Sequence, residues 1–168
     1  MDITQVILDD HAEQRRLFAA LEDIGPTDPA ASTAVWGRLS ALLDVHAEAE
    51  ERLFYPELVA LGRRDDGQEA EETEDAVHDH NEIRDAVRAV HGEEPGTDRW
   101  FAALAKVNEV NGDHMAEEER EGLTEFRRKV SLQERHRIAV RFLAFECDHL
   151  LGVQPVDKDP KEYVAAQS

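Results

Sequence analysis

Two histidine–glutamate pairs in this chain have the residue types and the spacing of metal ligands. His46 precedes Glu50 by four residues, and 68 positions later His114 precedes Glu118 by four residues. On an α-helix, side chains four residues apart lie one above the other, with Cβ atoms about 5–6 Å apart. Each pair therefore presents an imidazole nitrogen and a carboxylate to one side of its helix.

Two further histidines extend this duplication. His11 lies 35 residues before His46. His80 lies 34 residues before His114, so each half of the chain reads His…His-x-x-x-Glu. Such residues, projecting inward from facing helices, form a metal site in the core of a bundle. Imidazole and carboxylate donors without thiolate favour iron, manganese or zinc. Because six donors exceed the needs of one ion with an open position, the pattern predicts two ions that the glutamates can bridge.

Each of these residues also has an ordinary explanation when it is taken alone. A lone inward histidine such as His11 is more often a hydrogen-bonded core residue. A lone His-x-x-x-Glu pair is usually a helix-surface contact worth a few tenths of a kcal/mol. Glu50 and Glu118 also stand in acidic runs that would suit a solvated face. The metal interpretation rests on the coincidence that the same set occurs twice, with near-equal spacing and on apolar helix stripes.

Tyr55 is a further candidate ligand. It follows Glu50 by five residues and would point away from the ligand face of a regular helix. Pro56 removes a backbone donor and clashes with the preceding turn, so the helix is expected to kink or loosen near Tyr55. A π-type turn there would bring Tyr55 over the ligand face, where a phenolate favours ferric iron. A core aromatic residue at a helix bend is the alternative. The equivalent position in the second half is Leu123, so ligation by Tyr55 would make the two metal positions unequal.

The remaining histidines and the single cysteine are interpreted as structural or surface residues. His78 lies two positions before His80, so on a helix it points about 160° away from it. It also stands four residues before Glu82, which leaves a shifted register on this helix open. We place His91 at a helix end, interpret His136 and His149 as structural or exposed residues, and expect Cys147 to be a small core residue.

The segments that carry the candidate ligands have helical periodicity, and no strand pattern occurs. The predicted helices cover residues 4–22, 34–61, 73–91, 98–128 and 131–151, with Ser32 or Thr33 capping the second and 62–73 forming a loop or helix extensions. This pattern predicts an all-α fold, an antiparallel up-down four-helix bundle with an additional C-terminal fifth helix. We expect one domain over residues 1–152, with its four-helix core at 4–128, and a loosely held tail over 153–168.

Composition narrows the function classes. The 168 residues include 38 acidic and 19 basic side chains, for a net charge of −19. Such a chain repels phosphate backbones and anionic lipids, so nucleic acids and membranes are not expected partners. The single cysteine excludes an internal disulfide framework and suits a reducing compartment. The N-terminus lacks a signal-peptide pattern, and no apolar run approaches the roughly 20 residues of a membrane span. We expect a soluble, cytoplasmic protein, either a monomer or a homodimer.

The same residues resemble the hemerythrin-like proteins, which carry HHE cation-binding domains, and in particular their actinobacterial di-iron branch. The resemblance covers residues 5–128 and is carried by four motifs: His11 in Asp-His-x-x-x-Arg-x-Leu-Phe, His46 and Glu50 ahead of Leu-Phe-Tyr-Pro, His80 in His-x-x-Ile-Arg, and His114 with Glu118. It implies a four-helix bundle with two iron ions bridged by oxo or hydroxo. One iron would be served by His11 and His46, the other by His80 and His114. Glu50 and Glu118 would bridge the two.

One departure from that family bears on function. The resemblance implies that oxygen-carrying members have two histidines four residues apart on the third helix, but the positions four before and four after His80 are Ala76 and Arg84. A site poorer in nitrogen donors stabilises ferric iron. The resemblance therefore favours a reaction with hydrogen peroxide (catalase-like) or oxygen in a stress response. The alternative is a protein that binds or senses oxygen, nitric oxide or iron without turnover. Glu51 and Glu119 are candidate proton carriers.

Overall fold

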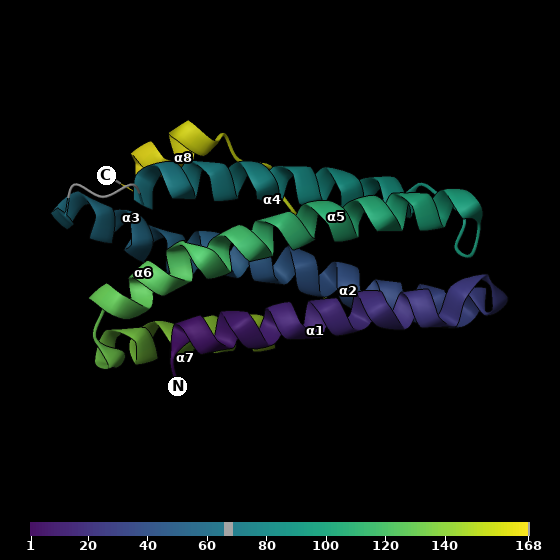
Figure 1. The fold of residues 1–168 in the computed structure, drawn as a ribbon, viewed down its shortest axis with the longest axis horizontal. Helices are drawn as coiled ribbons and strands as arrows, with labels where there is room; N and C mark the ends of the chain where they lie inside the picture. Colours follow the sequence, from purple (N-terminus) through teal and green to yellow (C-terminus); the bar gives the residue numbers. More distant parts are fainter. Residues whose placement is uncertain (66–68, 168) are drawn as a thin grey trace.

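The structure is a computed structural model that describes residues 1–65 and 69–167, and all regular elements in these residues are helical. Four long helices form the predicted bundle, each antiparallel to the long helix next to it in sequence (Figure 1). They are α1 (Ile3–Ile24), α2 (Pro29–Ala49), α4 (Glu69–His91) and α5 (Asp98–Arg120). α1 packs against α2, α4 packs against α5, and further contacts join α1 to α5 and α2 to α4. The four helices therefore enclose a common interior.

Shorter elements extend two of these helices and cover the bundle. A 3₁₀ turn, η1 (Gly25–Thr27), joins α1 to α2. α2 continues through a π-helical turn, η2 (Glu50–Phe54), into α3 (Tyr55–Asp65). α5 is followed by α6 (Gly122–Lys129). The predicted fifth helix is α7 (Leu132–Asp148), which packs against α1 and α2. A last helix, α8 (Pro160–Ala166), lies along α4 (Figure 1).

The second helix begins five residues earlier than the sequence pattern predicted. Its N-cap is Asp28, whose side chain accepts the backbone N–H of Ala31 at 3.0 Å, and Pro29 occupies the first helical position. Proline is favoured there because its missing N–H would lack a partner anyway. Thr33, predicted as a cap, instead lies inside the helix, where its hydroxyl donates to the carbonyl of Pro29 at 2.7 Å. The Asp28-Pro29 pair marks a helix start rather than the end of a loop.

The C-terminal residues differ from the expected loose tail. Asp159 caps α8 by accepting the backbone N–H of Glu162 at 2.9 Å. The side chain of Asn81 on α4 donates to the carbonyl of Lys158 at 2.7 Å and accepts its N–H at 3.1 Å. The ring of Tyr163 packs against the hydrophobic core. Residues 62–73 form extensions of α3 and α4, apart from residues 66–68, which lie outside the described residues.

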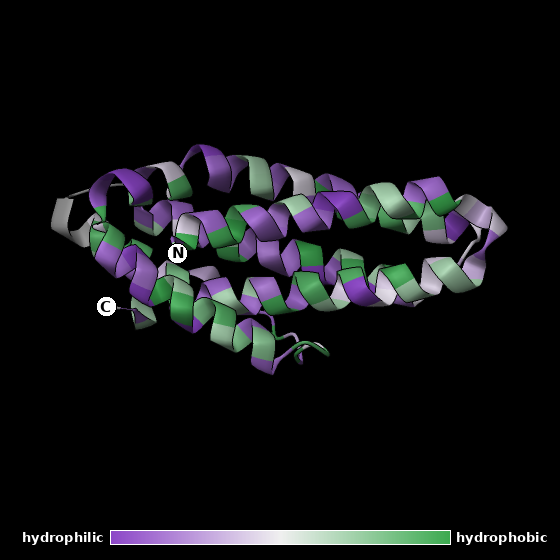
Figure 2. Ribbon diagram, turned by 90° about the horizontal axis from the view of Figure 1, so that it is seen from below, coloured by the Kyte–Doolittle hydropathy of each residue, from purple (hydrophilic) through white to green (hydrophobic). Residues whose placement is uncertain are grey.

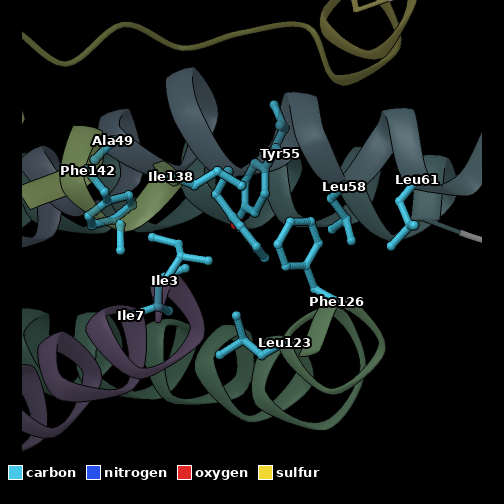
Figure 3. Packing of buried hydrophobic residues seen from close by; sticks show 13 residues of the cluster. Ile3, Ile7, Ala49, Tyr55, Leu58, Leu61, Leu123, Phe126, Ile138 and Phe142 are labelled. Atoms are coloured by element: carbon cyan, nitrogen blue, oxygen red, sulfur yellow. The ribbon is translucent and has the colours of Figure 1, made fainter. Parts of the chain in front are cut away.

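The hydrophobic core is divided into two clusters. Hydrophobic and hydrophilic residues are intermixed along the helices (Figure 2), and the buried hydrophobic side chains gather in the interior. One cluster surrounds Trp36 and Trp100. The other joins Ile7 of α1 to residues of α3, α6 and α7, and Figure 3 shows Phe142 of α7 in this cluster. Along α1, His11 falls between the residues of the two clusters. His46 on α2, His80 on α4 and His114 on α5 do the same, and these four buried histidines mark a polar layer between the clusters. None of the described helices combines the length and apolarity needed to cross a membrane.

Candidate metal centre

Four histidines converge in the polar layer, one from each long helix. His11, His46, His80 and His114 come from α1, α2, α4 and α5, and each is at most 4 % exposed. The ring centroids of His11 and His46 lie 5.1 Å apart, and those of His80 and His114 lie 4.7 Å apart. The Nε2 atoms of His80 and His114 approach to 3.2 Å. The structure therefore brings the predicted histidines together as two neighbouring pairs.

Glu50 lies between the two pairs and is fully buried. Its Oε1 atom is 3.1 Å from Nε2 of His46, and its Oε2 atom is 3.3 Å from Nε2 of His80. Three groups of described side chains have the geometry to hold a metal ion. One of them, Asp10 with His46 and Glu146, is only partly buried, and Glu50 belongs to the other two. These two are His11 with His46 and Glu50, and His80 with His114 and Glu50; within each group the ligand atoms lie within 4.8 Å of one another. This is the geometry expected of a carboxylate that bridges two ions.

Glu118 stands beside the first pair. Its Oε2 atom lies 3.4 Å from Nε2 of His11, and the residue is 7 % exposed. Several buried nitrogen and oxygen atoms here have no hydrogen-bond partner, namely Nε2 of His11, Nε2 of His46, Oε1 of Glu50 and both carboxylate oxygens of Glu118. Buried polar atoms are nearly always paired, because leaving one unpaired costs about 1–3 kcal/mol. These imidazole nitrogens and carboxylate oxygens therefore fit metal ions, because bound ions would give all of the unpaired atoms a partner.

The Nδ1 atom of each histidine faces a second carboxylate. Within each half, Nδ1 of His46 lies 3.1 Å from Asp10, and Nδ1 of His114 lies 3.4 Å from Asp79. Between the halves, Nδ1 of His11 lies 2.9 Å from Glu119, and Nδ1 of His80 lies 2.8 Å from Glu51. A carboxylate on Nδ1 holds the proton there and leaves Nε2 free for a metal ion. The eight residues repeat in both sequence and space.

Sequence reasoning missed the Nδ1 partners. It treated Glu51 and Glu119 only as candidate proton carriers. Each is one residue after a candidate ligand glutamate, a rotation of about 100° on a helix, and this turns each toward a histidine of another helix. Asp10 and Asp79 were not singled out. Each directly precedes a candidate ligand, His11 or His80, and the repeated Asp-His pair was the available signal.

The π-helical turn brings Tyr55 into the site. The backbone N–H of Tyr55 donates to the carbonyl of Glu50, five residues back, so the loosening expected near Pro56 takes the form of a π-type turn. The Tyr55 hydroxyl lies 3.4 Å from Oε2 of Glu50 and 3.4 Å from Nε2 of His80. Its ring stacks on His80, with centroids 5.6 Å apart. The equivalent Leu123 is a buried core residue without a donor atom, so the two halves differ here.

The family of the chain follows from comparison with known proteins. The family model of the hemerythrin HHE cation-binding domain matches residues 2–125, about three quarters of the chain. The chain belongs to the hemerythrin HHE family. It is also similar to a protein named DNA nickase from Nostoc sp. (strain PCC 7120 / SAG 25.82 / UTEX 2576), with 24 % identity over 144 residues. That match covers 86 % of this chain but only 39 % of the Nostoc protein. No solved structure matches the chain significantly.

The candidate centre of this hemerythrin-domain protein has strongly coupled charges. Burial acts to lower the pKa of His46, but Glu50 and Asp10 together raise it well above its usual value. Burial also acts to lower the pKa of His80, and Glu50 and Glu51 raise it to about 8. Burial would raise the pKa of Glu50, yet His46 and His80 hold it well below its usual range. In the metal-free protein, protons on the imidazoles balance the buried carboxylates, and metal binding displaces such protons.

The two positions on α4 that lack a second histidine have other roles. Ala76 packs against the hydrophobic cluster of α3, α6 and α7. Arg84 is 2 % exposed, and its guanidinium donates to Oε1 of Glu51 at 2.8 Å. Arg84 therefore supports the partner of His80 and offers no donor to a metal ion, because a guanidinium has only N–H groups.

The remaining histidines and the cysteine lie outside the centre. The side chain of His78 is 64 % exposed and stands 3.5 Å from Glu82, so the shifted register on α4 is not adopted. His91 packs on Trp36, with ring centroids 5.6 Å apart, and His149 stacks on Phe145. The expectation of a core position for Cys147 is wrong, because the residue is exposed.

Glu146 of α7 gives a testable consequence at the edge of the centre. Burial, followed by the charge and hydrogen bond of Asp10, raises the pKa of Glu146 to about 8. A carboxyl group with a raised pKa in the folded state makes the protein less stable as the pH rises from the unfolded toward the folded pKa. Glutamine stays neutral and avoids this loss. We expect metal-free E146Q to match the wild type at pH 4 and to be about 1 kcal/mol more stable at pH 9, allowing for screening at a partly exposed group. Urea denaturation measures this, and parallel pH profiles would contradict it.

Proposed function

We propose that the centre binds two iron ions, through His11 and His46 on one side and His80 and His114 on the other. Glu50 bridges the ions, Glu118 supplies a second carboxylate, and Tyr55 adds a phenolate to the ion beside His80. The observation that carries this proposal is that two candidate metal groups share Glu50 and contain buried donor atoms without partners. Iron is favoured over zinc by the family and by Tyr55, whose oxygen suits a ferric ion.

The reaction that this arrangement supports best is the catalase-like consumption of hydrogen peroxide. Two bound iron ions would supply two-electron redox chemistry and a clamp for both oxygens of a peroxide. The chain's own residues exclude bulk water, since the ligands are at most 7 % exposed. The Nδ1 carboxylates fix each ring, so that Nε2 stays directed at the ions. Overall, two molecules of peroxide give two of water and one of dioxygen.

A narrow cavity between α3, α4 and α5 supports a small, uncharged substrate. Tyr55, His114 and Glu118 form its inner wall. The space open to the centres of water-sized molecules is about 30 Å³, and one water needs about 10–15 Å³ on this measure. The cavity thus has room for a molecule of the size of peroxide. Its outer lining is acidic and comprises Glu72, Asp75, Asp79, Glu117 and Glu121. Such a rim disfavours anions and leaves neutral peroxide, dioxygen and nitric oxide as candidates.

Oxygen evolution tests this function. Protein loaded with iron should contain about two ions per chain and should release dioxygen when peroxide is added, whereas the metal-free protein should not. Two ions per chain without oxygen evolution would contradict catalase-like activity. If that protein also changed colour reversibly with dioxygen or nitric oxide, the binding and sensing alternative would replace it. Absence of bound iron would overturn the centre itself.

Replacing Tyr55 with phenylalanine tests the phenolate. Burial raises the pKa of the Tyr55 phenol well above its usual value, and the carboxylates of Glu118, Glu50 and Glu51 add to this rise. The proton is therefore lost only when a ferric ion replaces it. We expect iron-loaded wild-type protein to show a phenolate-to-iron absorption band in the visible, and Y55F to lose it while keeping its iron. Tyr163 is the other tyrosine of the chain, so Y163F is the control that should retain the band. Equal spectra for Y55F and the wild type would contradict ligation.

A further inference from the structure

Glu51 is the most heavily bonded of the carboxylates that hold the histidine rings. It is 2 % exposed and accepts hydrogen bonds at 2.8 Å from Nδ1 of His80 and at 2.8 Å from the guanidinium of Arg84. Its other oxygen accepts a hydrogen bond from the ammonium group of Lys158. The carboxylate that orients His80 is thus held by two cations, one from α4 and one from the C-terminal segment.

Lys158 lies outside the part of the chain that the family model matches, residues 2–125, and it is fixed in place on several sides. Its backbone makes two hydrogen bonds with the side chain of Asn81, one residue after His80. Its ammonium group also donates to Glu48 at 2.9 Å. Five residues later, the Tyr163 hydroxyl donates to the backbone carbonyl of Glu51. Two side chains of the C-terminal segment therefore contact Glu51. Lys158 bonds its carboxylate, and Tyr163 bonds its backbone carbonyl.

The corresponding carboxylate in the other half lacks such support. Glu119, which faces His11, has a side chain that is 29 % exposed, and its cation partner is Arg15, whose side chain is 47 % exposed. Water can solvate Glu119, whereas Glu51 is sealed from water. A buried carboxylate depends on its cation partners, because removing one of them leaves charge that nothing compensates. Lys158 therefore links Glu51, which bonds His80, to the C-terminal segment, whereas the cation partner of Glu119 lies on α1.

We propose that Lys158 is a positioning residue for the metal centre, which holds Glu51 against Nδ1 of His80, so that residues 153–167 complete the centre. The metal-dependent part of this inference rests on the proposed function. Outer partners of metal-bound histidines typically change metal affinity by about 10–100-fold. Since Arg84 remains when Lys158 is removed, the lower end of that range is expected, and the effect should fall on the ion held by His80 and His114.

Two readouts on the full-length protein test this role. In K158M, the affinity for ferrous iron at one of the two positions should fall about tenfold, measured by competition with a chelator. In the metal-free protein, the downfield proton NMR signal of the His80 Nδ1–H, assigned by its absence in H80Q, should weaken or disappear. K158R, which keeps the charge, should restore both. The NMR signal reports the hydrogen bond itself, which a lysine that merely packs the tail would not change.

The neighbouring Asp157 supplies a matched control. It pairs with Arg88 of α4 at 2.8 Å, and both side chains are about half exposed. D157N should leave iron affinity and the His80 signal unchanged. Wild-type behaviour of K158M in both readouts, or equal losses in D157N and K158M, would overturn the proposal. If wild-type protein bound no iron, the proposed function would fail, and the NMR comparison would still decide whether Lys158 positions His80.

Discussion

Replacing Glu50 with alanine is expected to lower the affinity for iron at both metal positions by at least about 100-fold, more than outer partners of metal ligands typically contribute. The reason is that Glu50 belongs to both fully buried candidate groups, one with His46 and one with His80. No other described residue belongs to both of the fully buried groups. Iron per chain, measured after gel filtration, should fall from about two to well below one. H114A, by contrast, should weaken mainly the position that it shares with His80.

Glu82 provides the control for Glu50. It stands four residues after a histidine, His78, with a contact of 3.5 Å, but both side chains are more than half exposed. E82A should therefore retain full iron content, because the His-x-x-x-Glu spacing alone makes no site. Full iron content in E50A would contradict the shared bridge, and a loss in E82A would point to binding on the surface of α4.

The convergence of the candidate ligands could be predicted because it depends on local geometry and duplication. Spacing within a helix fixes which side chains share a face, so His46 and Glu50 could be paired without knowledge of the fold. The effect of Pro56 is also local, because it predicted that the helix would kink or loosen near Tyr55, and a wider turn is found there. The relative positions of these residues could be predicted from the geometry of a single helix.

The partners of the ligands depend on relations between helices that spacing does not determine. Glu51 was assigned to a face away from the site, and only the neighbouring helix shows that this face meets His80. Lys158 is 107 residues from Glu51 in sequence, and a short polar tail with prolines gave no signal of a buried contact. Asp28 and Pro29 were interpreted as a loop because aspartate and proline favour both turns and helix starts. The expectation of iron came from the resemblance to a family, whereas the partners of the candidate ligands are visible only in the packing of the helices.

Removing the metal is expected to lower the thermal midpoint of the protein by about 10 °C without unfolding it. A ligand present at 1,000 times its dissociation constant stabilises the folded state by about 4 kcal/mol. For a domain of this size, each kcal/mol corresponds to about 2–4 °C. The metal-free protein should nevertheless remain folded, because hydrophobic clusters lie on both sides of the polar layer and need no ion. In that state, protonated imidazoles such as His46 offset the buried charge of Glu50.

Circular dichroism with a chelator and then with added ferrous iron measures this shift. The midpoint should fall on chelation and return when iron is restored. Helical content at about 20 °C should stay constant, because the two hydrophobic clusters hold the helices together without the ion. E50A should show a single midpoint that does not respond to either treatment. Complete unfolding on chelation would mean that the two clusters cannot sustain the bundle. An unchanged midpoint in the wild type would mean that the unpartnered donors of His11, His46 and Glu118 are not satisfied by a metal ion.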